Sequence, residues 1–214
     1  MARLSEMGER PENPSGRPRA PGHFVCVTGP SGVGKDTLIR IARAELGTRP
    51  EFLFPRRWIT RPPSDFEDHE PLSPGEFQAG VRAGLFALHW EAHGLGYAID
   101  SSVGPALADG RVVVCNISRA AVGAARMRFP LMKLVAVTAP EPVIAGRLAE
   151  RGREDTEAVN ERLQRNSAFA APSPSERIPD MTIVNDGRPE EAAHSLAGFL
   201  LSLRAESAVD QTCR

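Results

Sequence analysis

A glycine-rich run near the start of the sequence has the residue types and the spacing that bind phosphate groups. Residues 29–36 read GPSGVGKD, and a threonine follows. Glycines allow successive backbone N–H groups to turn toward a phosphate, and a lysine at this spacing reaches the β and γ oxygens of a nucleoside triphosphate. The run therefore predicts an ATP site in which the lysine neutralises charge during phosphoryl transfer. Its predicted members are Gly29, Pro30, Ser31, Gly32, Val33, Gly34, Lys35, Asp36 and Thr37.

The residue after the lysine departs from the usual form of this motif. Ser or Thr commonly stands there and offers a hydroxyl to Mg²⁺, whereas this chain has Asp36 followed by Thr37. The carboxylate can ligate Mg²⁺ directly, the threonine can take over the hydroxyl role, or the carboxylate can favour the positive end of the helix that follows. The sequence predicts Mg²⁺ with ATP as the cofactor and Asp36 and Thr37 as candidate ligands, without choosing between them.

A second cluster of charged residues lies at 147–155, which read RLAERGRED. Arg147 and Arg151 are four residues apart and so share a face of a predicted helix, and a glycine that follows can act as a hinge. Because a guanidinium grips phosphate with two parallel hydrogen bonds, we expect a lid over 147–165. In this lid Arg147 and Arg151 take part in catalysis, and Arg162 contacts substrate. The alternative is a solvated helix face paired with Glu150, Glu154 and Glu157.

These candidate residues need a scaffold, and the hydrophobic pattern predicts one. The run FVCVT at 24–28 is typical of a buried strand, and the apolar spacing of 36–46 predicts a helix that ends at Gly47. Three further apolar runs of strand length lie at 111–117, 131–139 and 180–186. Strands that alternate with helices predict an α/β P-loop NTPase fold with a parallel sheet covered on both faces.

Residues 55–100 have a different character and predict an inserted subdomain that binds the phosphoryl acceptor. Strand candidates lie at 56–60, 85–92 and 96–100. Between the first two, Ser73 is followed three residues later by Glu76, which is the signature of a capping box at a helix start. We therefore expect a small second sheet with one short helix.

Length, charge and cysteine usage limit the class of protein. The chain has 214 residues, enough for one globular domain with a buried core. Its 26 basic and 27 acidic residues leave a net charge of −1, so we expect neither nucleic acid nor an anionic membrane surface as a partner. No apolar run is long enough to span a bilayer or form a secretory signal, so we expect a cytoplasmic protein. Cys26, Cys115 and Cys213 lack metal-ligand spacing, and the first two are typical core residues.

The two ends of the chain predict little packed structure. Residues 1–22 hold four prolines and no periodic apolar pattern, which is typical of a disordered extension. A folded domain is expected over 23–205, followed by a C-terminal tail at 206–214. The sequence does not indicate an oligomeric state.

Six segments together resemble guanylate kinase in order and spacing across residues 23–200. They are GPSGVGKDT, ITRPP, the EF at 76–77, GLFALHWEAHGLGY, RLAERGRED and the late VND. The resemblance implies a P-loop kinase with an acceptor subdomain and a lid. It also implies that Arg61 and Tyr97 hold the phosphate of the acceptor.

The chain departs from guanylate kinase at the positions where that family reads the guanine base. Leu88, Ile99 and Asn116 stand there. A site built to hydrogen-bond guanine would leave the base unpaired against such side chains. GMP is therefore a poor candidate for the acceptor.

The remaining features are similar to the ribose 1,5-bisphosphate phosphokinase branch of the guanylate kinase group. GPSGVGKD, RWITR, ALHWEAHGLGYA and VVVCNISR match the pattern of that branch with small differences. The resemblance implies transfer of the γ-phosphoryl group of ATP to ribose 1,5-bisphosphate, which gives 5-phosphoribosyl 1-diphosphate, and a role in phosphonate breakdown. The open alternatives are a nucleoside monophosphate kinase with altered base preference and a binding module without catalysis. Lys35 and the three loop glycines weigh against the binding module.

Overall fold

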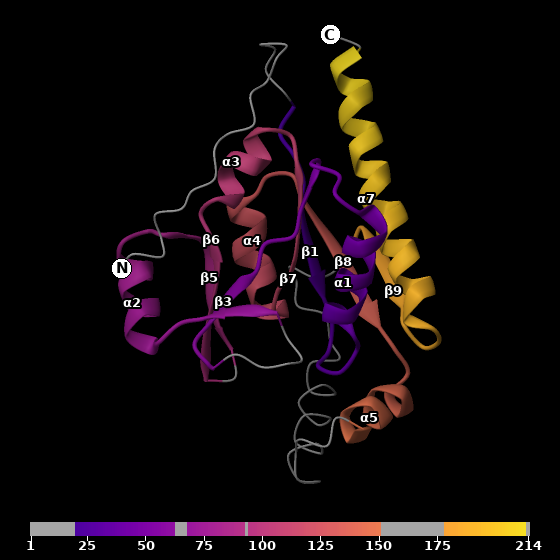
Figure 1. The fold of residues 1–214 in the computed structure, drawn as a ribbon, viewed down its shortest axis with the longest axis horizontal. Helices are drawn as coiled ribbons and strands as arrows, with labels where there is room; N and C mark the ends of the chain where they lie inside the picture. Colours follow the sequence, from indigo (N-terminus) through magenta and orange to yellow (C-terminus); the bar gives the residue numbers. More distant parts are fainter. Residues whose placement is uncertain (1–19, 63–67, 93, 151–177, 213–214) are drawn as a thin grey trace.

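The computed structural model describes residues 20–62, 68–92, 94–150 and 178–212. Two sheets and their helices make up this part of the chain (Figure 1). In chain order the elements are β1 (Phe24–Thr28), α1 (Lys35–Leu46), β2 (Phe52–Leu53), β3 (Arg57–Ile59), β4 (His69–Pro71), α2 (Pro74–Arg82), β5 (Phe86–Ala92), β6 (Leu95–Asp100), α3 (Val103–Ala108), β7 (Val112–Asn116), a 3₁₀ turn (Arg119–Ala121), α4 (Val122–Arg128), β8 (Met132–Thr138), α5 (Glu141–Glu150), β9 (Met181–Val184) and α7 (Pro189–Thr212).

The larger sheet has five strands in the order β2-β7-β1-β8-β9, and every neighbouring pair is parallel. The strand that leads into the glycine-rich run, β1, therefore lies at the centre. Its partners bring other strand ends to the same edge, since Val27 pairs with Asn116 on one side and with Val135 on the other. The predicted parallel α/β core is confirmed.

Helices cover both faces of this sheet, as expected for a buried parallel sheet. α1 and α7 lie on one face, and α3 and α4 lie on the other (Figure 1). Side chains of β1 alternate between the two faces of the sheet. Val25 and Val27 pack in the core with α1 and α7, and Phe24 and Cys26 pack in the core with α3 and α4. The glycine-rich run is thus anchored at both of its ends in packed structure.

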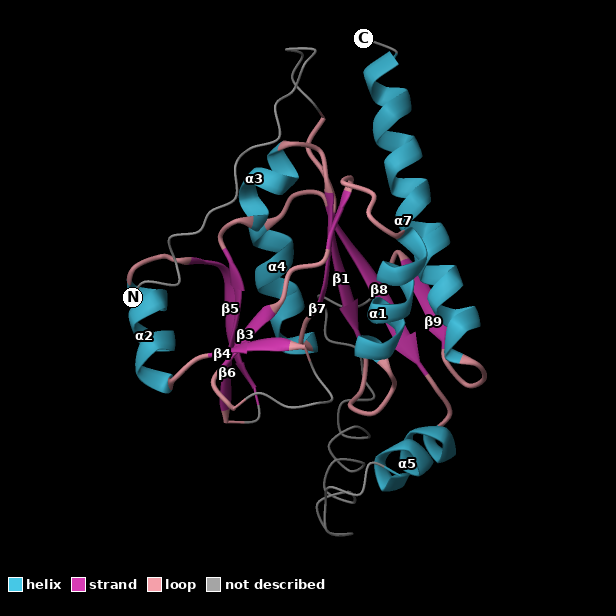
Figure 2. Ribbon diagram, in the orientation of Figure 1, coloured by secondary structure: helices cyan, strands magenta, loops and turns pink. Residues whose placement is uncertain are grey.

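The second sheet has four strands in the order β4-β3-β6-β5 and falls within the predicted subdomain at 55–100. Figure 2 shows α2 on its outer side, away from the parallel sheet. The capping box forms at the start of α2, where Ser73 Oγ accepts a hydrogen bond from the N–H of Glu76 at 3.2 Å. The return bond from the Ser73 N–H to the Glu76 carboxylate lowers the pKa of Glu76. On the inner face Leu88, Trp90 and Ile99 join the core that contains α3 and α4.

The ends of the chain differ from each other. Residues 1–19 of the predicted N-terminal extension lie outside the described residues, and Gly22 donates a hydrogen bond to the carbonyl of Leu107 at 2.7 Å. At the other end α7 continues to Thr212, so residues 206–212 are helical where the sequence predicted a tail. Among the helices in the described part of the chain, none is both long enough and apolar enough to cross a membrane.

Candidate active site

The glycine-rich loop joins the end of β1 to the start of α1, where parallel folds place phosphate sites. Two of its glycines have backbone angles and surroundings that no other residue tolerates. Gly29 has a φ of 146°, and a Cβ there would overlap the carbonyl oxygen of Val137 in β8. Gly34 has a φ of 96°, and a Cβ there would lie 2.6 Å from Nδ2 of Asn185. The loop backbone therefore fits closely against the ends of β8 and β9.

Lys35 is the first residue of α1, and its side chain turns back into the loop. Its Nζ donates hydrogen bonds to the carbonyl oxygens of Gly29 and Pro30, each at 2.9 Å. The ammonium group and the positive end of α1 thus lie on the same side of the loop. This arrangement suits an anion held by the loop N–H groups.

Two side chains from distant parts of the chain contact the backbone of the loop at the carbonyl of Val33. Asn185, directly after β9, is 2% exposed and donates from Nδ2 to the carbonyl of Val33 at 2.8 Å. Arg147 of α5 donates from Nη1 to the carbonyl of Asn185 at 2.9 Å and lies 3.4 Å from the carbonyl of Val33. The predicted catalytic Arg147 therefore lies next to the loop. Asn185 was not among the predicted site residues, although its place after a buried strand is a signal that could have found it.

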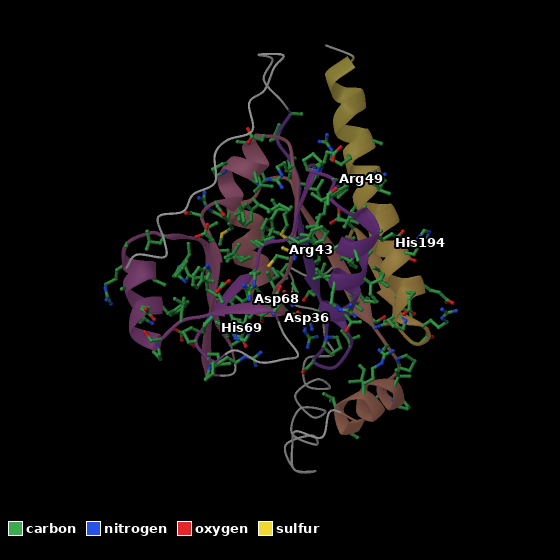
Figure 3. All side chains as sticks on the ribbon, in the orientation of Figure 1. Asp36, Arg43, Arg49, Asp68, His69 and His194 are labelled. Atoms are coloured by element: carbon green, nitrogen blue, oxygen red, sulfur yellow. The ribbon has the colours of Figure 1, made fainter. Side chains whose placement is uncertain are left out.

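Asp36 links the loop to the second sheet. Its Oδ1 accepts a hydrogen bond from Nδ2 of Asn116, at the end of β7. Nη2 of Arg57, the first residue of β3, lies 3.5 Å from the same oxygen. In Figure 3 Asp36 lies between α1 and the second sheet, with Asp68 and His69 on the side of that sheet. Arg57 was missed at the sequence level because only the fold brings it to Asp36.

The predicted metal ligands fit a hard cation. The Asp36 side chain is 50% exposed at the mouth of the loop, and Thr37 is half-buried one residue further along α1. Carboxylate and hydroxyl oxygens are the ligand types that Mg²⁺ prefers. The contacts of Asp36 with Asn116 and Arg57 fix the direction of its carboxylate without deciding between the two candidates.

An aromatic pair lies on the inner face of the second sheet, in the region predicted to bind the acceptor. Tyr97 of β6 stacks on its strand partner Trp90 of β5, with ring centroids 5.3 Å apart and planes within 5°. The guanidinium carbon of Arg57 lies 5.9 Å from the Tyr97 ring centroid. Arg61 follows the end of β3 and is half-buried. The two predicted acceptor-phosphate residues, Tyr97 and Arg61, therefore come from neighbouring strands.

The positions that match the base-reading residues of guanylate kinase are largely apolar and buried. Leu88 is 5% exposed and Ile99 is 0% exposed, and both belong to the core beneath the second sheet. Asn116 is 7% exposed, and its amide is engaged by Asp36. These side chains offer little to the hydrogen-bonding edge of a base.

Other predicted residues are not part of this geometry. Arg151 and Arg162 lie outside the described residues, as does the part of the predicted lid beyond Glu150. Burial raises the pKa of the Cys115 thiol to about 12 and raises that of Cys26 as well. Both thiols stay protonated at neutral pH, so they are core side chains and not nucleophiles.

A parallel sheet with a glycine loop between its central strand and first helix, and a lysine inside that loop, defines the P-loop NTPase fold. Solved structures show the same fold. A guanylate kinase from Anaplasma phagocytophilum aligns over 88% of this chain and 89% of its own, with a TM-score of 0.61 and 15% identity. A gluconokinase from Sinorhizobium meliloti 1021 covers 90% of this chain and 98% of its own, with a TM-score of 0.50 and 19% identity.

Curated relatives define the family more closely, although no family model matches the chain. The ribose 1,5-bisphosphate phosphokinase PhnN of Methylobacterium radiotolerans is 46% identical over 180 residues, which cover 84% of this chain and 98% of that protein. The PhnN of Acidiphilium cryptum is 49% identical over 86% of this chain and 94% of its own, and that of Chelativorans sp. is 39% identical over 96% of both. The chain belongs to the ribose 1,5-bisphosphate phosphokinase PhnN family.

Proposed function

We propose that this protein transfers the γ-phosphoryl group of ATP to ribose 1,5-bisphosphate and so forms 5-phosphoribosyl 1-diphosphate and ADP. The observation that carries the proposal is the 46% identity to a PhnN kinase over nearly the whole length of that protein. The PhnN name also supports a role in phosphonate catabolism. We propose the cytoplasm as the compartment because ATP is available there.

The proposed reaction needs alignment and charge neutralisation more than proton transfer. An oxygen of the 1-phosphate attacks the γ-phosphorus of ATP, the bond from that phosphorus to the β–γ bridging oxygen breaks, and ADP leaves with the electron pair. A phosphate oxygen is already anionic at neutral pH, so no general base is required. Lys35 and the loop N–H groups neutralise the charge that spreads over the transferred group.

Mg²⁺ would be held between ATP and the start of α1, with Asp36 or Thr37 as the protein ligand. When bound, it neutralises charge on the β- and γ-phosphates. Asn116 and Arg57 contact the carboxylate of Asp36 and so fix its orientation.

Arginines and a tyrosine complete the proposed site. Arg61 and Tyr97 are proposed to hold the accepting 1-phosphate, and Arg147 is proposed to act on the nucleotide side, where it already lies against the loop. Roles for Arg151 in catalysis and Arg162 in substrate binding remain predictions from the sequence.

The rival reading is a nucleoside monophosphate kinase. The buried Leu88 and Ile99 argue against it, because a base placed there would lose its hydrogen bonds to water without replacing them. A binding module without catalysis is disfavoured by the position of Lys35 inside the loop.

A substrate panel tests the proposal. With ATP and Mg²⁺, the purified protein should use ribose 1,5-bisphosphate with a kcat/KM at least about 100-fold above that for GMP, since a site that leaves base groups unpaired discriminates by this factor or more. Formation of ADP with each acceptor is measured by a coupled assay. Equal or faster turnover of GMP would refute the assignment.

A further inference from the structure

Asn185 reaches the glycine-rich loop from a distant part of the chain and is one of the most buried polar residues that the structure describes. It follows β9 directly and is 2% exposed. Its backbone N–H donates to the carbonyl of Thr138 in β8 at 2.7 Å. Its side-chain Nδ2 donates to the carbonyl of Val33 in the loop at 2.8 Å. The backbone of Asn185 is thus fixed to the sheet, and its amide connects the sheet to the loop.

The amide of Asn185 uses its donor but not its acceptor. Its Oδ1 is buried and has no hydrogen-bond partner among the residues that the structure describes. A buried acceptor without a partner lowers stability, and a leucine, which has a similar branched shape, would avoid that cost. The asparagine at this position is therefore explained by what its Nδ2 donor does for the loop, and not by a gain in stability.

The direction of the Val33 carbonyl fixes the direction of the next N–H group. The peptide bond between Val33 and Gly34 is planar and trans, so its C=O and N–H groups point to opposite sides. Asn185 holds the carbonyl toward the end of β9, and the N–H of Gly34 therefore points away from β9. Gly34 is the N-cap residue of α1, and its N–H donates to no backbone carbonyl among the described residues. This N–H is thus available to an anion held at the start of α1.

This peptide needs a restraint because glycine forms one side of it. Gly34 has a φ of 96°, and glycine adopts positive and negative φ values with similar ease. Without a partner for the Val33 carbonyl, the peptide plane can rotate and turn the N–H of Gly34 away from the loop. Nη1 of Arg147 lies 3.4 Å from the same carbonyl, which is a longer contact than the 2.8 Å bond from Asn185. Asn185 is therefore the stronger of the two restraints on this peptide plane.

We propose that Asn185 is a positioning residue that holds the Val33–Gly34 peptide so that the N–H of Gly34 donates to a phosphate of the bound nucleotide. This inference rests on the proposed function for the identity of that nucleotide as ATP. A hydrogen bond from an N–H to a phosphate oxygen is charge-assisted and stronger than one between neutral groups. Without Asn185 the donor must be ordered when ATP binds, and the cost of ordering it lowers the affinity.

Nucleotide binding in the absence of an acceptor tests this role. Asn185→Leu keeps the branched shape of the side chain but has no donor. With Mg²⁺ present, its Kd for ATP should be about tenfold higher than that of wild type, the lower end of the scale for one hydrogen bond to a charged group. Tripolyphosphate lacks the nucleoside, and its Kd, measured by competition with a labelled ATP analogue, should rise by the same factor. The melting temperature should stay within about 3 °C of wild type, because leucine also removes the unpaired Oδ1.

Ile183→Val on the same strand is the matched control. Ile183 is 3% exposed and packs in the core with α1 and α7, two residues before Asn185. The loss of one methyl group should lower the melting temperature by about 3 °C and leave both Kd values within about twofold of wild type. A rise in Kd as large as that of Asn185→Leu would attribute the effect to the stability of β9 and overturn the role of Asn185.

The comparison of the two ligands decides the outcome. Equal rises in Kd for ATP and for tripolyphosphate support the role of Asn185 in the phosphate loop. Unchanged Kd values overturn it, and so does a rise for ATP alone, which would place Asn185 against the nucleoside. If Asn185→Leu does not fold, Asn185→Ala carries the test, because it removes the donor without adding volume. The same rise of about tenfold for both ligands is then expected, and unchanged Kd values refute the role.

Steady-state kinetics separate this inference from the proposed function. The KM for ATP should rise about tenfold in Asn185→Leu, and the KM for ribose 1,5-bisphosphate should change less than about threefold. Equal rises in both KM values would indicate a general distortion of the site and overturn the specific role. If wild type binds ATP but does not phosphorylate ribose 1,5-bisphosphate, the proposed function fails, and the Kd values for ATP and tripolyphosphate still decide the role of Asn185.

Discussion

Replacing Lys35 with methionine should lower kcat by about a thousandfold or more while the protein still folds. The uncharged side chain leaves the charge on the transferred phosphoryl group without its lysine partner in the transition state. Steady-state kinetics with saturating ATP and ribose 1,5-bisphosphate measure the loss, and circular dichroism with a thermal melt checks the fold.

The chain offers a matched control, because Lys133 is its other lysine. Lys133 lies on β8, where its Nζ is 3.4 Å from Asp180 in a partly exposed pair. Lys133→Met should keep kcat within about twofold of wild type, since exposed pairs contribute little. A Lys35→Met protein that folds and keeps more than about a tenth of kcat would show that the loop is not the catalytic phosphate cradle, because a tenfold change is only about 1.4 kcal/mol.

Replacing Gly29 with alanine should lower the free energy of unfolding by about 3 kcal/mol or more and abolish ATP binding. The new Cβ would overlap the carbonyl oxygen of Val137, and β8 cannot move away without breaking its pairing with β1. The strained φ of 146° adds to the cost of this overlap. Urea unfolding measures the stability, and fluorescence titration with a labelled ATP analogue measures binding.

Gly84 separates backbone strain from this steric overlap. It has a φ of 65°, but apart from its own chain neighbours no residue comes within 4 Å of the position of its Cβ. Gly84→Ala should therefore cost about 1 kcal/mol from the left-handed backbone alone and leave ATP binding intact. If Gly29→Ala costs no more than Gly84→Ala, the loop does not fit against β8 as described.

The hydrophobic pattern predicted the strands of the parallel sheet that lie in continuous apolar runs, and it missed the very short strands. β1, β7, β8 and β9 lie within the apolar runs expected for them. β2 has two residues and β4 has three, and both form only because a neighbouring strand offers its edge. A stretch this short carries no period that a sequence alone could show.

The site was predictable where its residues are adjacent in the chain and not where the fold assembles them. The loop and Lys35 could be found because a motif of consecutive residues fixes their chemistry. Asn185 reaches Val33 across 152 residues, and Arg57 reaches Asp36 across 21 residues. Such contacts depend on the order of strands in the sheet, which the sequence pattern left open.

Phosphorus NMR of the reaction product tests the proposed sugar bisphosphate kinase activity most directly. The protein is incubated with ribose 1,5-bisphosphate, ATP and Mg²⁺ until ADP accumulates. Besides the two diphosphate resonances of ADP, the proposed reaction predicts two further, mutually coupled resonances of a sugar diphosphate, one of them coupled also to the anomeric proton, while the 5-phosphate remains a monoester. A diphosphate attached at C5, or ADP formed without any sugar diphosphate, would contradict it.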